Sequence, residues 1–171
     1  MIVELTEDEI MDSLRFVHRV RENKKQYDVV DKKFDKGNTS YSVNLLGRLG
    51  EVAVSKVLRV PTDDAITPGG DSGYDLETPT KRIQVKTSTL PQLIFNSLEL
   101  FTADVAVLVH FTGDKVLPHV DGVYDVMGWV DRQTFFDNYY NHDYGYGVRF
   151  VMNAENLYKM EDFTDDIPGL H

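Results

Sequence analysis

The sequence predicts an α/β protein with a central mixed β-sheet flanked by helices, and three observations lead to this class. Two segments near the N-terminus carry apolar residues at helical spacing. A later run, residues 104–111, is rich in β-branched residues and is typical of a buried central strand. Helical and strand-like segments are interspersed along the chain, which favours a mixed sheet with helices packed on it.

The N-terminal half predicts two helices. Thr6 and Glu9 have the spacing of a capping box, and apolar residues follow at positions 10, 14 and 17. A second helix is expected from the polar cluster 38–42 to about residue 58. Its apolar stripe consists of Leu45, Leu46, Leu49, Val52, Ala53 and Val57.

The remaining elements are shorter. We expect strands at 74–77, 82–87, 104–111, 123–130 and 148–152. A short helix is expected over 131–139, with Asp131 as its N-cap. The tyrosine-rich stretch 139–147 is expected to be a loop, which either covers the edge of the core or stacks on nucleic-acid bases.

Length and composition indicate one globular domain of 171 residues. We divide it into an N-terminal helix and basic segment (1–37), a core (38–160) and an acidic tail (161–171). The absence of cysteine excludes disulfides, thiolate metal sites and cysteine nucleophiles. No apolar run is long enough for a bilayer and no G-x-x-x-x-G-K phosphate loop occurs, so we expect a cytoplasmic protein with no membrane and no nucleotide cofactor.

The net charge is −10, from 18 Lys and Arg against 28 Asp and Glu. This balance weighs against a nucleic-acid partner, because phosphate binding is mainly electrostatic. Residues 15–36, however, hold eight basic and four acidic residues, a local charge of +4 that leaves −14 for the rest. The segment that includes Lys24 and Lys25 could follow a DNA backbone or form an ordinary solvated surface.

A predicted hairpin carries the most informative side chains. Residues 83–86 alternate apolar and polar, so Gln84 and Lys86 share one face of their strand. If residues 79 and 80 centre the turn, Asp75 lies opposite Gln84. A carboxylate, an amide and an ammonium group would then meet at one place, although Asp75 and Lys86 could also form only a surface ion pair of small value.

The second predicted helix adds another acid. Gly47, Glu51 and Ser55 follow each other at intervals of four residues and so lie on one line along the helix. Gly47 and Gly50 each cost about 1 kcal/mol relative to alanine inside a helix. Close approach of another backbone or of a ligand would offset this cost, which places Glu51 on a closely approached surface.

Three segments together resemble the PD-(D/E)XK nuclease superfamily, which has the restriction-endonuclease-like fold. They are Gly47-Arg-Leu-Gly-Glu51, Gly73-Tyr-Asp75-Leu and Gln84-Val-Lys86-Thr-Ser. The resemblance covers residues 42–88, and the element order beyond them is similar to that of small phage-type members. Tyr74 stands where the family usually has proline, and Gln84 stands where it usually has an acid.

The resemblance implies a DNA-hydrolysing enzyme that uses Mg²⁺ or Mn²⁺. Glu51, Asp75, Gln84 and Lys86 would form the catalytic set, and the cation would be held by Glu51, Asp75, Gln84 and the carbonyl of Val85. Oxygen ligands of this kind suit hard divalent cations. Further candidate contacts to DNA are Arg48, Ser55, Thr87, Ser88, Lys24 and Lys25.

Two other function classes stay open from the sequence. The fold could serve without activity as a DNA-binding or phage assembly module. The acidity could instead make the chain a DNA mimic that occupies a basic partner. The oligomeric state is not determined by the sequence, although a homodimer would suit cleavage of both DNA strands.

Overall fold

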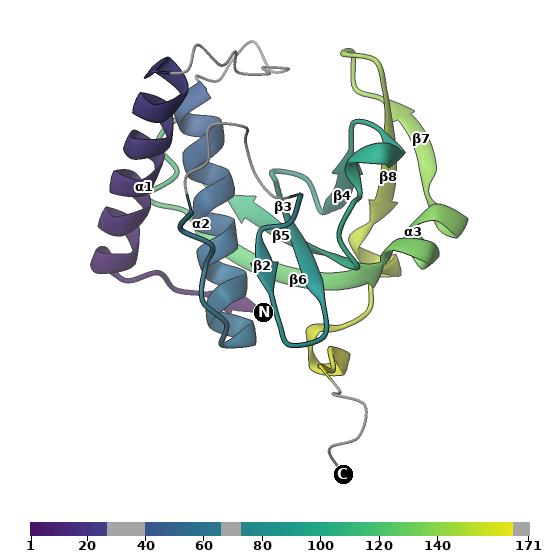
Figure 1. The fold of residues 1–171 in the computed structure, drawn as a ribbon. Coiled ribbons are helices and arrows are strands. Elements are labelled where there is room, and N and C mark those ends of the chain that lie inside the picture. The colour runs from purple at the N-terminus through teal and green to yellow at the C-terminus, as the bar shows by residue number, and fades with distance from the viewer. Residues whose placement is uncertain (27–39, 66–72, 166–171) are drawn as a thin grey trace.

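The computed structural model describes residues 1–26, 40–65 and 73–165. Its elements form three layers: a pair of helices, a five-stranded mixed sheet, and a second sheet with a short helix beside it (Figure 1). The predicted α/β class is therefore confirmed. The prediction that helices flank one central sheet is wrong in part, because the second sheet covers one face.

The helical layer consists of α1 (Glu7–Gln26) and α2 (Ser40–Leu58). The predicted capping box is present, since the Glu9 N–H donates to Thr6 Oγ1 at 3.2 Å and the Thr6 N–H donates to Glu9 Oε2 at 2.7 Å. Lys56 of α2 also donates to Glu9 Oε2, at 2.9 Å. One carboxylate thus caps α1 and joins the two helices.

Replacing Glu9 with alanine should lower the free energy of unfolding at pH 7 by about 1 kcal/mol, the usual scale for a lost cap. Burial alone would raise the pKa of Glu9, but the Thr6 N–H and the Lys56 ammonium group lower it. A lowered pKa means that the stabilisation is complete above the ordinary value of about 4.3 and is lost as the pH falls through the folded-state value. Urea unfolding from pH 7 to pH 3 should show the difference shrinking.

The exposed first-turn acid Glu7 provides the control for this measurement, because it occupies the same turn of α1. Glu7→Ala should change the stability by a few tenths of a kcal/mol at most. A Glu9→Ala deficit that persists unchanged at pH 3 would contradict the assignment.

The central sheet has the strand order β1-β6-β5-β3-β2. Its strands are β1 (Ile2–Val3), β2 (Leu76–Glu77), β3 (Arg82–Ser88), β5 (Val105–Thr112) and β6 (Val123–Asp131). Only the β3–β5 pair is parallel; the other neighbours are antiparallel. The 104–111 strand prediction is confirmed as β5.

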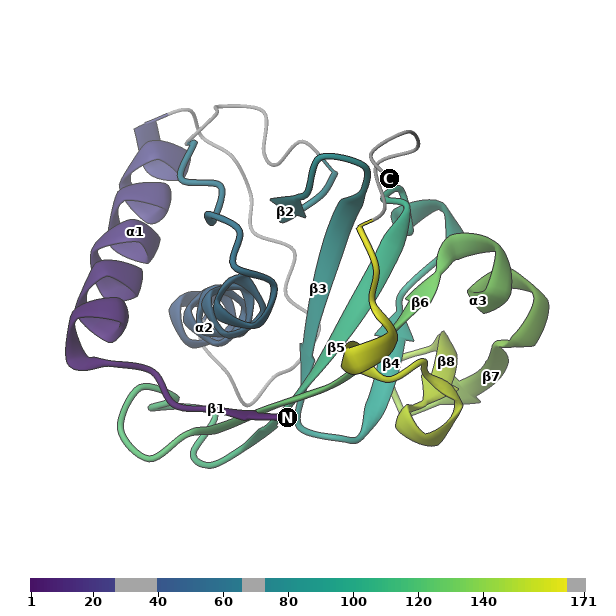
Figure 2. The same cartoon turned by 90° about the horizontal axis from the view of Figure 1, so that it is seen from below.

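Strand β5 is buried on both faces, which explains its nearly continuous apolar sequence. Val105, Val107, Val109 and Phe111 join the core under α1 and α2, and Ala106 and Leu108 join the core on the opposite face. Figure 2 shows β3 and β5 between the helices on one side and the second sheet on the other.

The second sheet has the order β4-β8-β7, with β4 (Gln92–Phe95), β7 (Tyr140–Asp143) and β8 (Val148–Asn153). Helix α3 (Arg132–Asn138) lies beside it, and its predicted cap is confirmed because the Thr134 N–H donates to Asp131 Oδ1 at 2.8 Å. The sequence predicted a loop where β7 lies. All four residues of β7 are exposed, so it has no apolar alternation and is defined only by pairing with β8.

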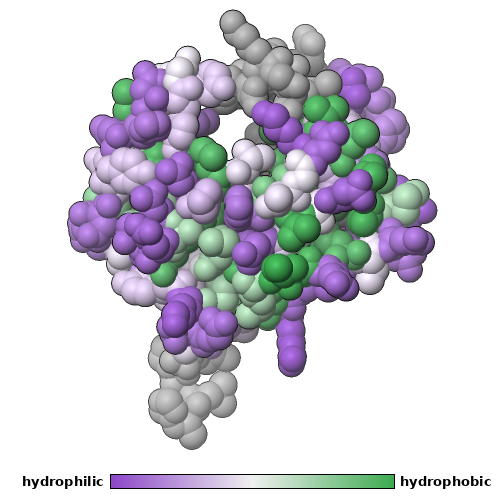
Figure 3. Space-filling view, turned by 180° about the vertical axis from the view of Figure 1, so that it is seen from behind, coloured by the Kyte–Doolittle hydropathy of each residue, from purple (hydrophilic) through white to green (hydrophobic). Residues whose placement is uncertain are grey.

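Short 3₁₀ turns complete the described chain: Leu98–Leu100, Ala154–Asn156 and Met160–Asp162. In Figure 3 hydrophilic residues are spread over the rear face and hydrophobic ones form smaller islands between them. None of the helices within the described ranges has the length and apolar character needed to cross a bilayer.

Candidate functional site

The hairpin of β2 and β3 has the register that the sequence predicted. Leu76 pairs with Ile83, and the Thr78 N–H donates to Lys81 O at 2.9 Å across the turn. The ladder continues one residue before β2, because the Asp75 N–H donates to Ile83 O at 2.8 Å. Asp75 therefore lies at the predicted position opposite residue 84.

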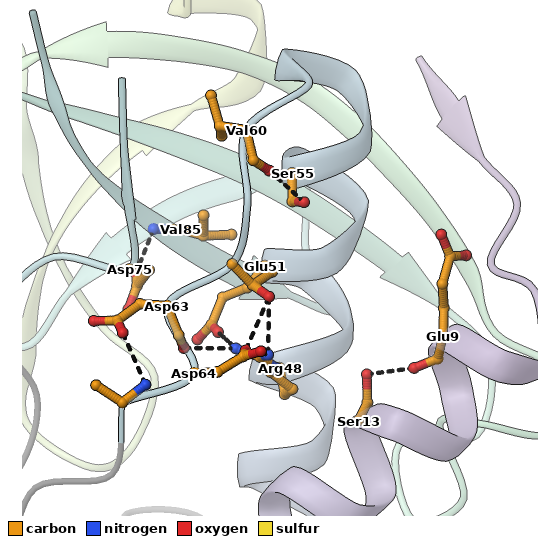
Figure 4. A network of polar contacts seen from close by, with 12 residues as sticks. Glu9, Ser13, Arg48, Glu51, Ser55, Val60, Asp63, Asp64, Asp75 and Val85 are labelled. Atoms are coloured by element: carbon orange, nitrogen blue, oxygen red, sulfur yellow. Dashed lines mark hydrogen bonds and ion pairs between the residues drawn. The ribbon is translucent and has the colours of Figure 1, made fainter. Parts of the chain in front are cut away.

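The Asp75 carboxylate lies along the edge of β3. Its Oδ2 accepts a hydrogen bond from the Val85 N–H at 2.6 Å, which replaces the ladder bond that a longer β2 would make (Figure 4). A carboxylate held by a backbone donor has a defined orientation without any contribution from a long side chain. Val85 itself is almost fully buried, with 9% of its surface exposed.

Glu51 projects from α2, and its Oε2 is 3.2 Å from Arg48 Nη1. Figure 4 shows Asp75 on the β3 side of Glu51. The two predicted carboxylates thus come from the two elements that pack against each other here, a helix and a strand edge.

Gly50 and Thr87 mark the closest approach of α2 to β3. A Cβ atom built on Gly50 would lie 1.9 Å from Thr87 Oγ1. Gly50 directly precedes Glu51, and Thr87 directly follows Lys86. The predicted close approach is therefore confirmed at Gly50. It is not confirmed at Gly47, where a Cβ atom would meet no described atom within 4 Å.

The two glycines should respond to alanine in opposite directions. Gly50→Ala should lower the free energy of unfolding by about 1–3 kcal/mol, because the Thr87 side chain has to move. Gly47→Ala should raise it by about 1 kcal/mol, the gain in helix propensity where nothing described obstructs the methyl group. Urea unfolding of both variants measures the contrast, and adding Thr87→Ala to Gly50→Ala should recover part of the loss. Equal effects of the two alanines would contradict the packing.

Gln84 has a different environment from the one predicted. It is buried, and its Oε1 accepts hydrogen bonds from the backbone N–H groups of Thr102 at 3.0 Å and Ala103 at 3.2 Å. Its Nε2 donates to Leu100 O at 2.9 Å. The amide thus holds the segment before β5, and a metal-ligand role would require it to give up these hydrogen bonds.

The Gln84→Glu variant separates the structural role from the ligand role. At pH 7 the carboxylate cannot donate to Leu100 O, so we expect the free energy of unfolding to fall by about 1–3 kcal/mol. Chemical unfolding at pH 7 tests this. A variant as stable as the parent that also needs less Mn²⁺ for DNA cleavage would support the ligand role instead.

Lys86 lies on the same strand face as Gln84, as predicted. Its Nζ lies 4.9 Å from the ring centroid of Phe95, a residue of β4. This contact places the ammonium group between the central sheet and the second sheet. The hairpin therefore positions Lys86 and Asp75 two register places apart along the same strand.

Arg48 is the centre of a polar cluster that the sequence did not predict. The residue is 6% exposed, and its guanidinium lies 3.9 Å from the Phe16 ring centroid. Besides Glu51, it donates to Thr62 Oγ1 at 3.0 Å, to Asp63 O at 3.1 Å and to Asp64 (Figure 4). The prediction that Arg48 contacts DNA is wrong for this structure, because its guanidinium is directed into the protein.

The other predicted DNA contacts differ in accessibility. Thr87 Oγ1 is buried beside Gly50. Ser55 donates to Val60 O at 2.7 Å, and Ser88 accepts from the Leu90 N–H at 3.1 Å. Lys24 and Lys25 lie in the last turn of α1, where Lys25 forms an exposed ion pair with Glu22 at 3.2 Å. The remaining lysines of the basic segment, at 32, 33 and 36, lie outside the described residues.

Within the ranges that the structure describes, no three or more His, Cys, Asp or Glu side chains are grouped so that they could hold a metal ion. The predicted ligand set contains two carboxylates and is smaller than such a group. Comparisons with protein-family models, with curated proteins and with solved structures found no match to the chain.

Proposed function

We propose that the chain is a metal-dependent nuclease that hydrolyses DNA phosphodiester bonds with Mg²⁺ or Mn²⁺. The observation that carries the proposal is the contact of Gly50 with Thr87. Through it the backbone at Glu51 approaches the strand that bears Lys86, and Asp75 is bonded to the edge of that strand at Val85. Two carboxylates and one ammonium group are thus contributed by adjoining elements, in the order of the resembled motif.

The residues present fit a hard divalent cation, because Mg²⁺ and Mn²⁺ prefer carboxylate and carbonyl oxygens. Glu51 and Asp75 would hold it, and the Val85 carbonyl could add a third oxygen. Gln84 is left out of this ligand set because its amide is bonded to residues 100–103. Arg48 already neutralises part of the charge of Glu51, so Asp75 would supply most of the uncompensated charge.

The bound cation would supply charge neutralisation at the phosphate and a water of lowered pKa. Lys86 Nζ would donate hydrogen bonds to the attacking water or to a phosphate oxygen and stabilise negative charge that develops there. The Val85 N–H holds Asp75 in orientation, and Arg48 holds Glu51.

A second function is favoured by one observation. Glu51 is paired with Arg48 and Gln84 is committed to backbone groups, which would suit a DNA-binding module without activity. Supercoiled, linear and branched DNA incubated with and without Mn²⁺ discriminates the two. Products that depend on Mn²⁺ support the nuclease. Binding without products supports the module, and no binding at low salt contradicts both.

A further inference from the structure

The last described segment, residues 158–165, joins β6 to the tip of the β2–β3 hairpin; we refer to it as the C-terminal strap. Its beginning is anchored on Trp129. Tyr158 and Trp129 exchange backbone hydrogen bonds of 2.9 and 3.0 Å, and the Trp129 indole N–H donates to Lys159 O at 3.1 Å. Met160, with 7% of its surface exposed, joins the core under the helices.

Asp165, near the other end of the strap, grips the hairpin turn. Its Oδ1 accepts hydrogen bonds from the Thr78 hydroxyl at 2.6 Å, from the Thr80 N–H at 3.3 Å and from the Thr80 hydroxyl. Burial opposes ionisation of this group, yet the donors from Thr78 and Thr80 and the charge of Lys81 keep the pKa of Asp165 below its usual range. Asp165 is therefore an ionised acceptor at neutral pH.

Further contacts hold the strap beside the same turn. The Lys81 Nζ donates to Thr164 O at 2.6 Å. The Phe163 ring lies edge-on to Trp129, with centroids 5.3 Å apart, and Lys81 Nζ is 5.6 Å from its centroid. The strap thus connects the turn to β6, a strand separated from β2 by β5 and β3.

The hairpin has reason to need this support. β2 is a two-residue edge strand that pairs only with β3 within the central sheet. An isolated pair of such short strands is marginally stable in water. Asp75 directly precedes β2, so the hydrogen bond from the Val85 N–H to its carboxylate depends on β2 remaining paired.

We propose that Asp165 is a positioning residue for Asp75. By gripping the 78–81 turn it keeps β2 paired with β3 and keeps the Asp75 carboxylate bonded to the Val85 N–H. Its consequence for cation binding rests on the proposed function, whereas the positioning itself does not.

Amide hydrogen exchange followed by NMR tests the positioning. In Asp165→Ala we expect the Thr78 and Val85 amides to exchange at least tenfold faster, while the amides of β5 keep the rates of the parent. Asp162→Ala is the matched control, because it removes an exposed acid from the same strap. Asp165→Asn retains the Oδ1 acceptor and should restore most of the protection.

Cation dependence provides a second readout, which a merely structural role would not move. The Mn²⁺ concentration for half-maximal cleavage should rise several-fold in Asp165→Ala, the rate at saturating Mn²⁺ should stay close to that of the parent, and Asp165→Asn should restore the parental requirement.

The outcomes separate the two proposals. Unchanged exchange of Val85 in Asp165→Ala overturns the positioning role, whether or not the parent cleaves DNA. Faster exchange at every amide, β5 included, also overturns it, because the effect would then be global. A parent without Mn²⁺-dependent cleavage overturns the proposed function, and the exchange data still decide the role of Asp165.

Discussion

Replacing Lys86 with alanine should reduce Mn²⁺-dependent DNA cleavage by about 10²–10⁴-fold, the range that a positioned proton-transfer group contributes. The protein should remain folded, because the main contact printed by the geometry for this side chain is that of its ammonium group with the Phe95 ring. A contact of this type contributes about 1 kcal/mol. Cleavage rates at saturating Mn²⁺, measured together with urea unfolding, test both statements.

Two further variants make the Lys86 result specific. Lys159→Ala removes an exposed lysine from elsewhere on the surface and should cleave at the rate of the parent. Asp75→Asn should lose cleavage while its remaining carbonyl oxygen still accepts from the Val85 N–H. If Lys86→Ala cleaves DNA as fast as the parent, the proposed mechanism is wrong.

Replacing Arg48 with methionine should lower the free energy of unfolding by about 3 kcal/mol, the lower end of the range for removing one partner of a buried ion pair. The variant leaves Glu51 and the backbone oxygen of Asp63 without their guanidinium donors. It also removes the cation from the face of the Phe16 ring. Chemical unfolding at pH 7 measures the loss.

Glu51→Gln is the matched variant for the same pair. Its side-chain oxygen can still accept from Arg48, so we expect a stability change of less than about 1 kcal/mol. Cleavage should nevertheless be lost, because a neutral amide is a weaker ligand for Mg²⁺ than a carboxylate. An Arg48→Met protein as stable as the parent would show that the guanidinium cluster is dispensable.

Local patterns predicted much of this fold, because the forces behind them act over a few residues. The Thr6–Glu9 box, the Asp131 cap and the apolar run of β5 each express a short-range preference. The hairpin register followed from the turn alone, since a slip by one residue would have turned Ile83 out of the core.

The missing parts depend on contacts between distant residues. β7 has no apolar alternation, and only pairing with β8 makes it a strand. The partners of Gln84 lie 16 to 19 residues away, and those of Arg48 include the 62–64 segment beyond the end of α2. A charged residue on a helix suggests a surface, so its burial could not be read from spacing.

The packing of Trp129 has a practical consequence. It is the only tryptophan in the chain, and its ring contacts Tyr158 and Phe163 of the C-terminal strap, with centroids 5.0 and 5.3 Å away. Its indole N–H is bonded to the same segment. The protein thus carries one intrinsic fluorophore at the root of the strap, and its emission reports the docking of that segment without an added label.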